Sequence, residues 1–148
     1  MPIGCRRPRP TGGFQVLPEW VVPSVLARSS RPGYPGERGG SVPADVVDRW
    51  LEEVRALGIH SILCLLDDAQ LAYYESVPGG LLEHYRRSGL RVGHIPVMDL
   101  QSPPIPAAEL EEVGRVFASL PKPVLIHCSA GMDRTGAAVE YILRKIES

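Results

Sequence analysis

Ten residues near the C-terminus, HCSAGMDRTG at 127–136, combine a cysteine with small residues, an arginine and a threonine. They follow the apolar run PVLI and precede a stretch with helical periodicity, so they lie where a strand turns into a helix. Between Cys128 and Arg134, backbone N–H groups can curl inward and form a nest for an anion. Gly131 permits the curl because it takes a positive φ without strain. The string therefore predicts a loop that binds a phosphate group.

The same loop offers a nucleophile. The N-terminus of the following helix and the Arg134 guanidinium would stabilise the thiolate of Cys128, which is the form that attacks phosphorus. Arg134 adds a planar fork for two phosphate oxygens, and Thr135 would assist the departure of the thiolate in a hydrolytic second step. His127 would brace the loop through hydrogen bonds to the backbone. The predicted phosphate-binding residues are Ser129, Ala130, Gly131, Met132, Asp133 and Arg134.

The full string HC-x-x-G-x-x-R-T-G is far more specific than a glycine-containing turn with a cysteine, and it lacks the Gly-Lys-Ser/Thr ending of a nucleotide-binding P-loop. It resembles the signature of the cysteine-dependent protein tyrosine phosphatase superfamily, most closely its dual-specificity and atypical bacterial branches. The resemblance covers residues 14–148 in layout and implies a cysteinyl-phosphate intermediate with no metal or other cofactor. Low-molecular-weight tyrosine phosphatases and arsenate reductases carry a similar loop near the N-terminus, which argues against them.

The resemblance also implies a general acid on a loop before the cysteine. Asp99 lies 29 residues before Cys128, where a strand ends and the loop MDLQSPPIP begins. A carboxyl group on such a loop can protonate the leaving oxygen and then activate water. Asp67 and Asp68 compete, because they also follow a strand, although we expect one of them to cap the next helix. We therefore assign the acid to Asp99.

Asp133 immediately precedes Arg134 inside the loop, where its carboxylate weakens the positive field on a phosphate. It would orient Arg134 or a water, or donate a proton itself, and we expect support of Arg134. Phosphoinositide-directed relatives carry Asp-Arg at this place, often with a lysine before it. Met132 stands where that lysine would be, so fewer cations face the pocket, which argues against a highly phosphorylated inositol substrate.

A second motif, ARSSRPGYPGERG, lies between the first strands and the first long helix. Arg-Ser and Arg-Pro-Gly strings occur at this place in some bacterial and archaeal relatives. We expect Arg28, Arg31 and Tyr34 to border the pocket and contact substrate, with a solvated loop as the alternative.

The elements that must position these residues alternate along the chain. Apolar runs predict strands at 14–20, 25–29, 60–66, 91–97 and 123–128. Apolar stripes with helical spacing predict helices at 43–58, 69–77, 79–89, 107–120 and 134–146. The alternation predicts an α/β three-layer sandwich with a mainly parallel central sheet of about five strands flanked by helices. In such folds ligands bind at the carboxyl ends of strands, which is where the loop lies.

Length and composition set the remaining expectations. The 148 residues suit one domain, which we place at 13–148 after a flexible tail at 1–12. A net charge of −1 gives no case for nucleic acid, and no apolar run is long enough for membrane insertion. Three scattered cysteines lack metal-ligand spacing and favour a reducing cytoplasm. We expect Cys64 in the core and Cys5 to be incidental.

The chain ends about one helix after the signature, whereas most relatives continue through further helices, so we expect an exposed apolar face. The oligomeric state stays open. Together these features predict a compact cytoplasmic protein tyrosine or dual-specificity phosphatase that acts on a phosphorylated protein or peptide. The alternatives are a phosphatase for phosphoinositides or other small phosphate esters, and a phosphate-binding module without turnover.

Overall fold

The computed structural model describes residues 16–35 and 42–147. The predicted tail at 1–12, with Cys5, lies outside the described residues. The strands are β1 (Glu19–Val22), β2 (Leu26–Ser29), β3 (Ser61–Cys64), β4 (Arg91–His94) and β5 (Val124–His127). The helices are α1 (Ala44–Ala56), α2 (Asp68–Leu71), the 3-10 turn η1 (Ala72–Tyr74), α3 (Leu81–Arg87), α4 (Ala107–Ser119) and α5 (Asp133–Glu147).

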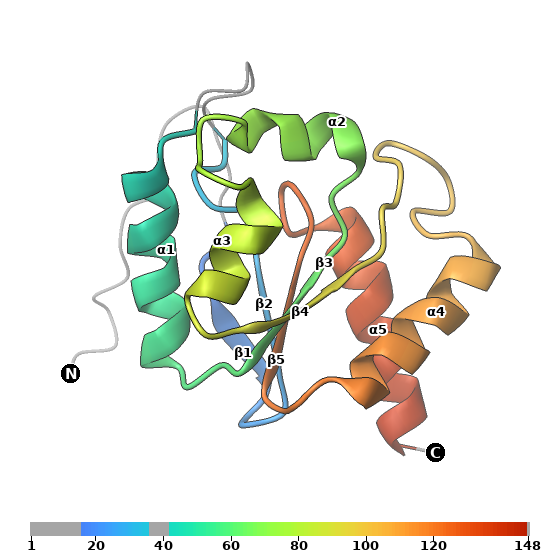
Figure 1. Ribbon diagram of the computed structural model, residues 1–148. Helices are drawn as coiled ribbons and strands as arrows, with labels where there is room; N and C mark the ends of the chain where they lie inside the picture. The colour runs from blue at the N-terminus through green and yellow to red at the C-terminus, as the bar shows by residue number, and fades with distance from the viewer. Residues whose placement is uncertain (1–15, 36–41, 148) are drawn as a thin grey trace, which may run out of the picture.

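The five strands form one sheet in the order β1-β2-β5-β3-β4. β1 pairs antiparallel with β2, and the other three pairs are parallel. Helices α1 and α3 cover one face of the sheet, and α4 and α5 cover the other (Figure 1). The predicted three-layer sandwich with a mainly parallel sheet is therefore confirmed.

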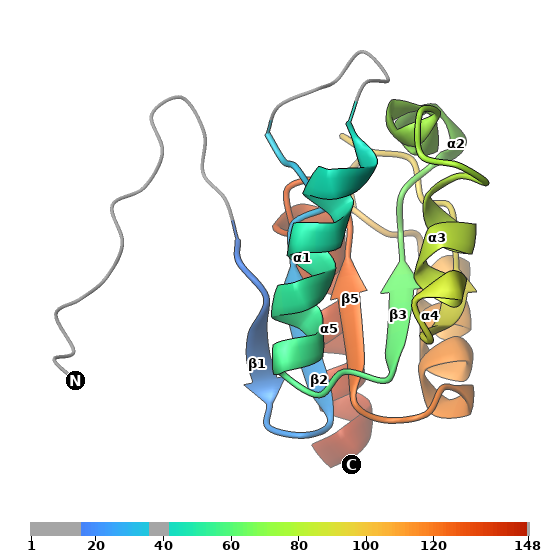
Figure 2. The same cartoon turned by 60° about the vertical axis from the view of Figure 1, so that its left-hand side comes forward.

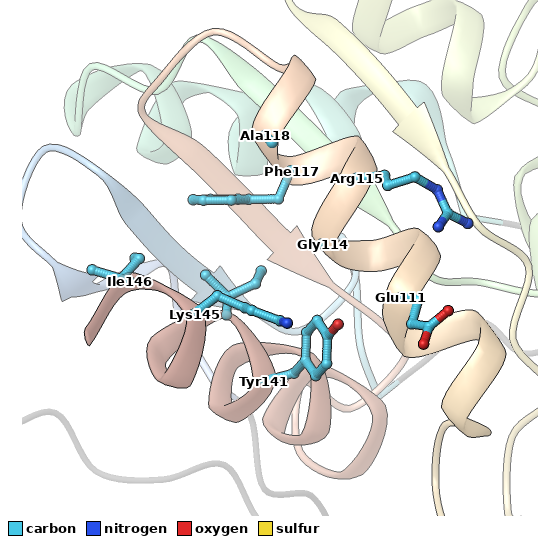
Figure 3. Close-up of a pocket in the computed structure, with 9 residues that line it drawn as sticks. Glu111, Gly114, Arg115, Phe117, Ala118, Tyr141, Lys145 and Ile146 are labelled. Carbon is cyan, nitrogen blue, oxygen red and sulfur yellow. The ribbon is translucent and has the colours of Figure 1, made fainter. Parts of the chain in front are cut away.

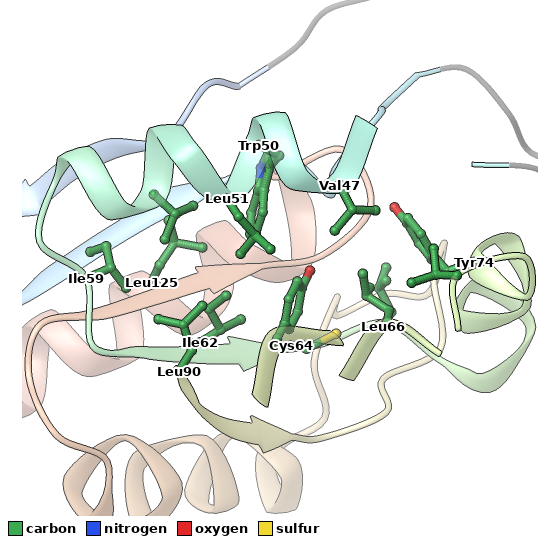
Figure 4. Close-up of a cluster of buried hydrophobic side chains, with 14 of the residues drawn as sticks. Val47, Trp50, Leu51, Ile59, Ile62, Cys64, Leu66, Tyr74, Leu90 and Leu125 are labelled. Carbon is green, nitrogen blue, oxygen red and sulfur yellow. The ribbon is translucent and has the colours of Figure 1, made fainter. Parts of the chain in front are cut away.

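The central strands are buried on both faces, because helices cover both sides of the sheet. All four residues of β3 and all four of β5 are buried. Figure 4 shows one of the two cores, in which Trp50 and Leu51 of α1 pack over Ile62 and Leu125 of the sheet. Cys64 lies in the same core, as predicted, and burial raises the pKa of its thiol to about 12. It is therefore an inert thiol at neutral pH.

Helix α1 follows the predicted stripe, with Val47, Trp50, Leu51 and Val54 buried. The predicted helix at 69–77 is divided into α2 and η1. Of the strand predicted at 14–20, residues 14 and 15 lie outside the described residues, and β1 begins at Glu19. Pro18 immediately precedes it and has no N–H to donate to a strand ladder, which accounts for the later start.

The carboxyl ends of the parallel strands lie at one edge of the sheet, and the predicted site residues follow them (Figure 2). Cys128 comes directly after β5, the loop with Asp99 follows β4, and Asp67 follows β3. The sheet thus brings together residues that are far apart in the sequence. Among the described residues, no helix has the length and apolar character to cross a membrane.

Candidate active site

The loop 128–132 joins β5 to α5 and holds the cysteine at its base. Cys128 is 2% exposed, and the Gly131 N–H donates to its Sγ at 3.3 Å. Gly131 has a φ of +78°, the left-handed conformation that glycine adopts without strain. Helix α5 begins at Asp133, so its free N–H groups come directly after the loop. The cysteine therefore lies beside a backbone donor at the positive end of a helix.

The outer side of the loop is held by segment 28–31. Three successive carbonyl groups of the loop, those of residues 129 to 131, each accept a hydrogen bond from this segment. The donors are Arg31 N to Ser129 O at 2.8 Å, Ser30 Oγ to Ala130 O at 2.7 Å and Arg28 Nη2 to Gly131 O at 2.6 Å. Because C=O and N–H point in opposite directions across a planar peptide, the following N–H groups turn inward. Segment 28–31 therefore shapes the anion nest.

This arrangement corrects the expected role of the second motif. Arg31 is 1% exposed, and its Nε donates to Ser129 Oγ at 3.1 Å and its Nη1 to Tyr74 Oη at 3.2 Å. Arg28 also binds the loop from outside. Neither arginine lines the pocket above Cys128, whereas Tyr34 does, as expected. Both arginines hold the loop from outside and are not among the described residues that line the pocket.

Arg134 is buried, and one edge of its guanidinium is held in place. Its Nη1 donates to Val97 O at 2.8 Å, Gln70 Oε1 at 2.9 Å and Leu65 O at 3.2 Å. Its Nε and Nη2 are also buried but make no hydrogen bond, although Nη2 lies 3.2 Å from Asp99 Oδ2. The guanidinium is thus fixed by one nitrogen and keeps two donors for another acceptor.

Asp99 lies beside Arg134 and is held there by Gln70, a residue that the sequence analysis did not identify. Its Oδ2 accepts from Gln70 Nε2 at 3.1 Å, and its Oδ1 accepts from the Leu100 N–H at 2.9 Å. Gln70 therefore bridges Arg134 and Asp99 with the two ends of one amide. The signal that could have found Gln70 is its position in the first turn of a helix that follows the carboxyl end of a strand.

Among the described residues, no ion pair joins Arg134 to any of the other candidate acids. Asp67 caps α2, as expected for one of the pair, by accepting from the Gln70 N–H at 2.9 Å, and it also lines the pocket. Asp68 is exposed and outside the pocket lining. Asp133 is exposed and lines the pocket, but the carboxylate that contacts Arg134 within the described residues is that of Asp99. The expected support of Arg134 by Asp133 therefore stays a prediction, because the described residues show no ion pair between the two side chains.

His127 lies behind the loop in the sheet core. Its Nδ1 is 3.0 Å from Cys128 O, and because a carbonyl only accepts, Nδ1 carries the hydrogen. Its Nε2 then accepts from Tyr85 Oη at 2.9 Å. Burial lowers the pKa of His127 to about 4, so the ring is neutral at pH 7. Thr135 is fully buried, and its Oγ1 has no hydrogen-bond partner in the described structure. The roles predicted for both residues stay predictions.

These groups surround a pocket of about 410 Å³. It is lined by Tyr34, Asp67, Ala69, Gln70, Tyr73, Asp99, Leu100, Cys128, Ser129, Ala130, Asp133 and Arg134. The Arg31 guanidinium lies 4.9 Å from the Tyr73 ring centre and 5.5 Å from that of Tyr34, which fixes both aromatic walls. Met132, predicted to bind phosphate, is 44% exposed and outside this lining.

A second pocket, of about 570 Å³, lies between α4 and α5 (Figure 3). Phe117 of α4 and Tyr141 and Ile146 of α5 line it, and Ile146 is 47% exposed. The described residues that line it include no cysteine, serine or threonine. The described residues contain no group of three or more His, Cys, Asp or Glu that could hold a metal. The candidate chemistry therefore lies in the pocket above Cys128.

Comparison with known proteins identifies the family and the fold. The family model for the DSP-PTPase phosphatase of polymorphic toxin systems matches residues 41–147. No protein of curated function matches the sequence. A solved kinase associated phosphatase, with its catalytic-site cysteine replaced by serine, is 23% identical at a TM-score of 0.60, and the match covers 82% of this chain and 65% of that one. The chain therefore spans slightly less than two thirds of that phosphatase.

A second solved protein, Tk-PTP, is similar in two forms. A mutant form is 24% identical at a TM-score of 0.59, and the match covers 89% of this chain and 74% of that one. The active form is 25% identical at a TM-score of 0.52, and the match covers 84% and 71%. These likenesses show a shared fold.

Proposed function

The chain belongs to the DSP-PTPase phosphatase family of polymorphic toxin systems, and from this premise we propose that it hydrolyses phosphotyrosine in proteins or peptides through a cysteinyl-phosphate intermediate. The family match confirms the resemblance to cysteine-dependent, dual-specificity-like phosphatases. The substrate class and the intermediate are our proposal, as is its role as the phosphatase module of such a toxin system. Action in the cytoplasm stays a prediction.

The Arg134 guanidinium is the observation that carries this proposal. Its Nε and Nη2 are buried without a hydrogen bond in a pocket that also contains Cys128. Leaving a buried donor unsatisfied costs about 1–3 kcal/mol. A phosphate would remove this cost, because its oxygens match the planar fork of Nε and Nη2. The inward N–H groups of the loop would hold the remaining oxygens.

The reaction then proceeds in two displacements. Cys128 Sγ attacks phosphorus, so that the S–P bond forms while the bond to the leaving oxygen breaks and Asp99 protonates that oxygen. Water next attacks the phosphocysteine, Asp99 takes its proton, and the S–P bond breaks to return the thiolate. The Thr135 hydroxyl would stabilise the departing thiolate. Arg134 and the loop stabilise the charge on the transferred phosphoryl group in both steps.

The position of Asp99 supports its role as the acid. Its Oδ2 lies 3.2 Å from Arg134 Nη2, which is one of the atoms that would bind a phosphate oxygen. Because this nitrogen carries two hydrogens, it can contact a phosphate oxygen and the carboxyl group of Asp99 together. The carboxyl group of Asp99 would then lie beside the bound phosphate, where the leaving oxygen needs a proton.

The walls of the pocket support phosphotyrosine as the substrate. Tyr34 and Tyr73 line it above Cys128, and Leu100 adds an apolar side chain that is 94% exposed. Aromatic rings pack favourably against another ring in stacked or edge-to-face arrangements. The phenyl ring of phosphotyrosine would fill this space, whereas phosphoserine offers no ring to contact these walls.

The first test is turnover of para-nitrophenyl phosphate in EDTA. We expect activity in the intact protein and none in Cys128→Ser. Cys64→Ala is the matched control, because Cys64 is a buried thiol in the core, and this variant should stay active. Activity that survives Cys128→Ser, or that requires a metal, would contradict the proposal. Phosphate binding without turnover would indicate a binding module instead.

A second test assigns the proton donor. An alkyl phosphate has a poor leaving group, so its hydrolysis depends on the acid. We expect Asp99→Asn to lower kcat/KM on it by about 10²–10⁴-fold and to have a smaller effect on para-nitrophenyl phosphate. Asp133→Asn tests the competing residue, and Asp68→Asn is an exposed control outside the pocket. The assignment fails if Asp99→Asn is the mildest of the three.

A further inference from the structure

The pocket above Cys128 holds a guanidinium at its base and carboxylates nearer to solvent. Among the described residues that line it, three carry a carboxylate, one carries a guanidinium and none is a lysine. The guanidinium of Arg134 is buried at the base, where Asp99 pairs with it. Asp67 and Asp133 are the other two carboxylates, and both side chains reach solvent. Among the described residues of the lining, no second cation balances them, so this part of the opening carries negative charge.

The base of the pocket independently indicates an anionic ligand. Arg134 lines the pocket and is 1% exposed, yet its Nε and Nη2 make no hydrogen bond, and among the described residues Nη2 has the ion pair with Asp99 alone. One phosphate group satisfies these donors. A second anionic group on the same substrate would lie nearer the opening, beside Asp67 or Asp133. The pocket is thus suited to one phosphate with positive charge next to it.

Resting on the proposed function, we propose that Asp67 and Asp133 select phosphotyrosine flanked by lysine or arginine and disfavour substrates with a second anionic group beside the phosphate. The phosphate occupies the Arg134 fork and the ring lies between the tyrosine walls. The flanking cation then reaches the carboxylates at the opening. Its aliphatic stem packs on Leu100, which lines the pocket and is 94% exposed.

The expected size of this selection follows from the exposure of the two carboxylates. A charge pair near the surface changes an equilibrium constant by about two- to five-fold. Exchanging a flanking lysine for glutamate replaces one attraction by one repulsion, so the dissociation constants should differ by about four- to twenty-five-fold. The difference should shrink as salt is added, because exposed charges are screened.

The test uses the full chain with Cys128→Ser, which binds without turnover. Two fluorescent phosphotyrosine peptides differ only in lysine or glutamate beside the phosphotyrosine, and anisotropy gives their Kd values at low salt. We expect tighter binding of the lysine peptide, a reduced ratio after Asp133→Asn or Asp67→Asn, and a reversed preference after Asp133→Lys. Asparagine at 67 retains the helix cap. Asp68→Asn is the matched control, because it removes one negative charge at the residue after Asp67, outside the pocket. The ratio of the two Kd values should not change in this variant.

Several results would overturn the inference. A ratio near one in the Cys128→Ser protein would do so, as would a ratio that Asp133→Asn and Asp67→Asn leave unchanged or that Asp68→Asn reduces equally. Tighter binding of a bisphosphorylated inositol than of the lysine peptide would point to lipid headgroups instead. Turnover of the same peptides is measured separately with Cys128 intact. Absent turnover would contradict the proposed function, whereas the Kd ratio decides the charge selection.

Discussion

Replacing Gly131 by alanine tests the contact between the phosphate loop and segment 28–31. An alanine Cβ at this position would lie 2.8 Å from the carbonyl carbon and oxygen of Ser29 and 2.8 Å from the nitrogen of Ser30. These are backbone atoms at the end of β2, where Ser29 pairs with His127 of β5. Moving them would disturb the sheet. The loop itself must shift, and it then loses the hydrogen bonds that hold its carbonyl groups outward.

The expected loss in the free energy of unfolding has two parts, and substitution of a second glycine separates them. A φ of +78° costs a residue other than glycine about 1–2 kcal/mol, and overpacking against fixed atoms adds about 1–3 kcal/mol. We therefore expect Gly131→Ala to lower the free energy of unfolding by about 2–5 kcal/mol. Gly58 has nearly the same φ, +80°, but a Cβ there meets no atom within 4 Å. Gly58→Ala should cost only the first part, about 1–2 kcal/mol.

Urea unfolding of both variants measures these free energies, and para-nitrophenyl phosphate turnover measures the function of the loop. Losing a backbone donor from an anion-binding site lowers rates by about 10²–10³-fold, and Gly131→Ala should show a loss of this order. Gly58→Ala should retain kcat/KM, because Gly58 lies beyond the end of α1. Equal destabilisation by the two substitutions, together with full activity in Gly131→Ala, would refute the reasoning.

Three further predictions concern groups that hold the loop and the arginine. Because burial lowers the pKa of His127 from 6.5 to about 4, the unfolded chain is protonated first as the pH falls. The free energy of unfolding should therefore decrease by about 3 kcal/mol between pH 6.5 and 4 and then level off. In urea unfolding, His127→Asn should show a weaker dependence on pH over this range. The same pH dependence in His127→Asn as in the intact protein would contradict the lowered pKa of His127. Gln70→Leu should lower kcat/KM by about ten- to a hundred-fold, since it removes one charged hydrogen bond each from Arg134 and Asp99; an unaltered kcat/KM would remove Gln70 from the site. Ser30→Ala leaves Ala130 O without its donor and should cost about 1–3 kcal/mol in urea unfolding, whereas Ser119→Ala, on the exposed end of α4, should cost less.

The sequence was most informative where the signal is local. The apolar runs predicted both buried strands that flank the site, and the spacing of Cys128 and Arg134 located the loop without knowledge of the fold. Helix α1 could be predicted with its buried face, because Val47, Trp50 and Val54 repeat at helical spacing. Such features depend on residues that are a few positions apart in the sequence. They can therefore be predicted without knowledge of the tertiary packing.

The missing parts depend on contacts between distant segments. Gln70 binds Arg134 across 64 positions, and Arg28 binds Gly131 across 103. The sequence indicates the arginines of the second motif as candidates. The direction of their side chains, however, depends on the parallel register of β2 with β5, which pairs Arg28 with Ile126. A sequence pattern does not contain that register, so it could not show that these side chains hold the loop instead of bordering the pocket.

The central claim is that Cys128 carries the phosphoryl group during turnover. The most direct measurement is acid quenching of the protein within the first turnovers of para-nitrophenyl phosphate, followed by mass spectrometry of its peptides. The account predicts a phosphoryl group on the peptide that contains Cys128 and none on the peptide that contains Cys64. A phosphoryl group on any other residue, or turnover with no phosphorylated peptide even when hydrolysis is slowed by Asp99→Asn, would contradict it.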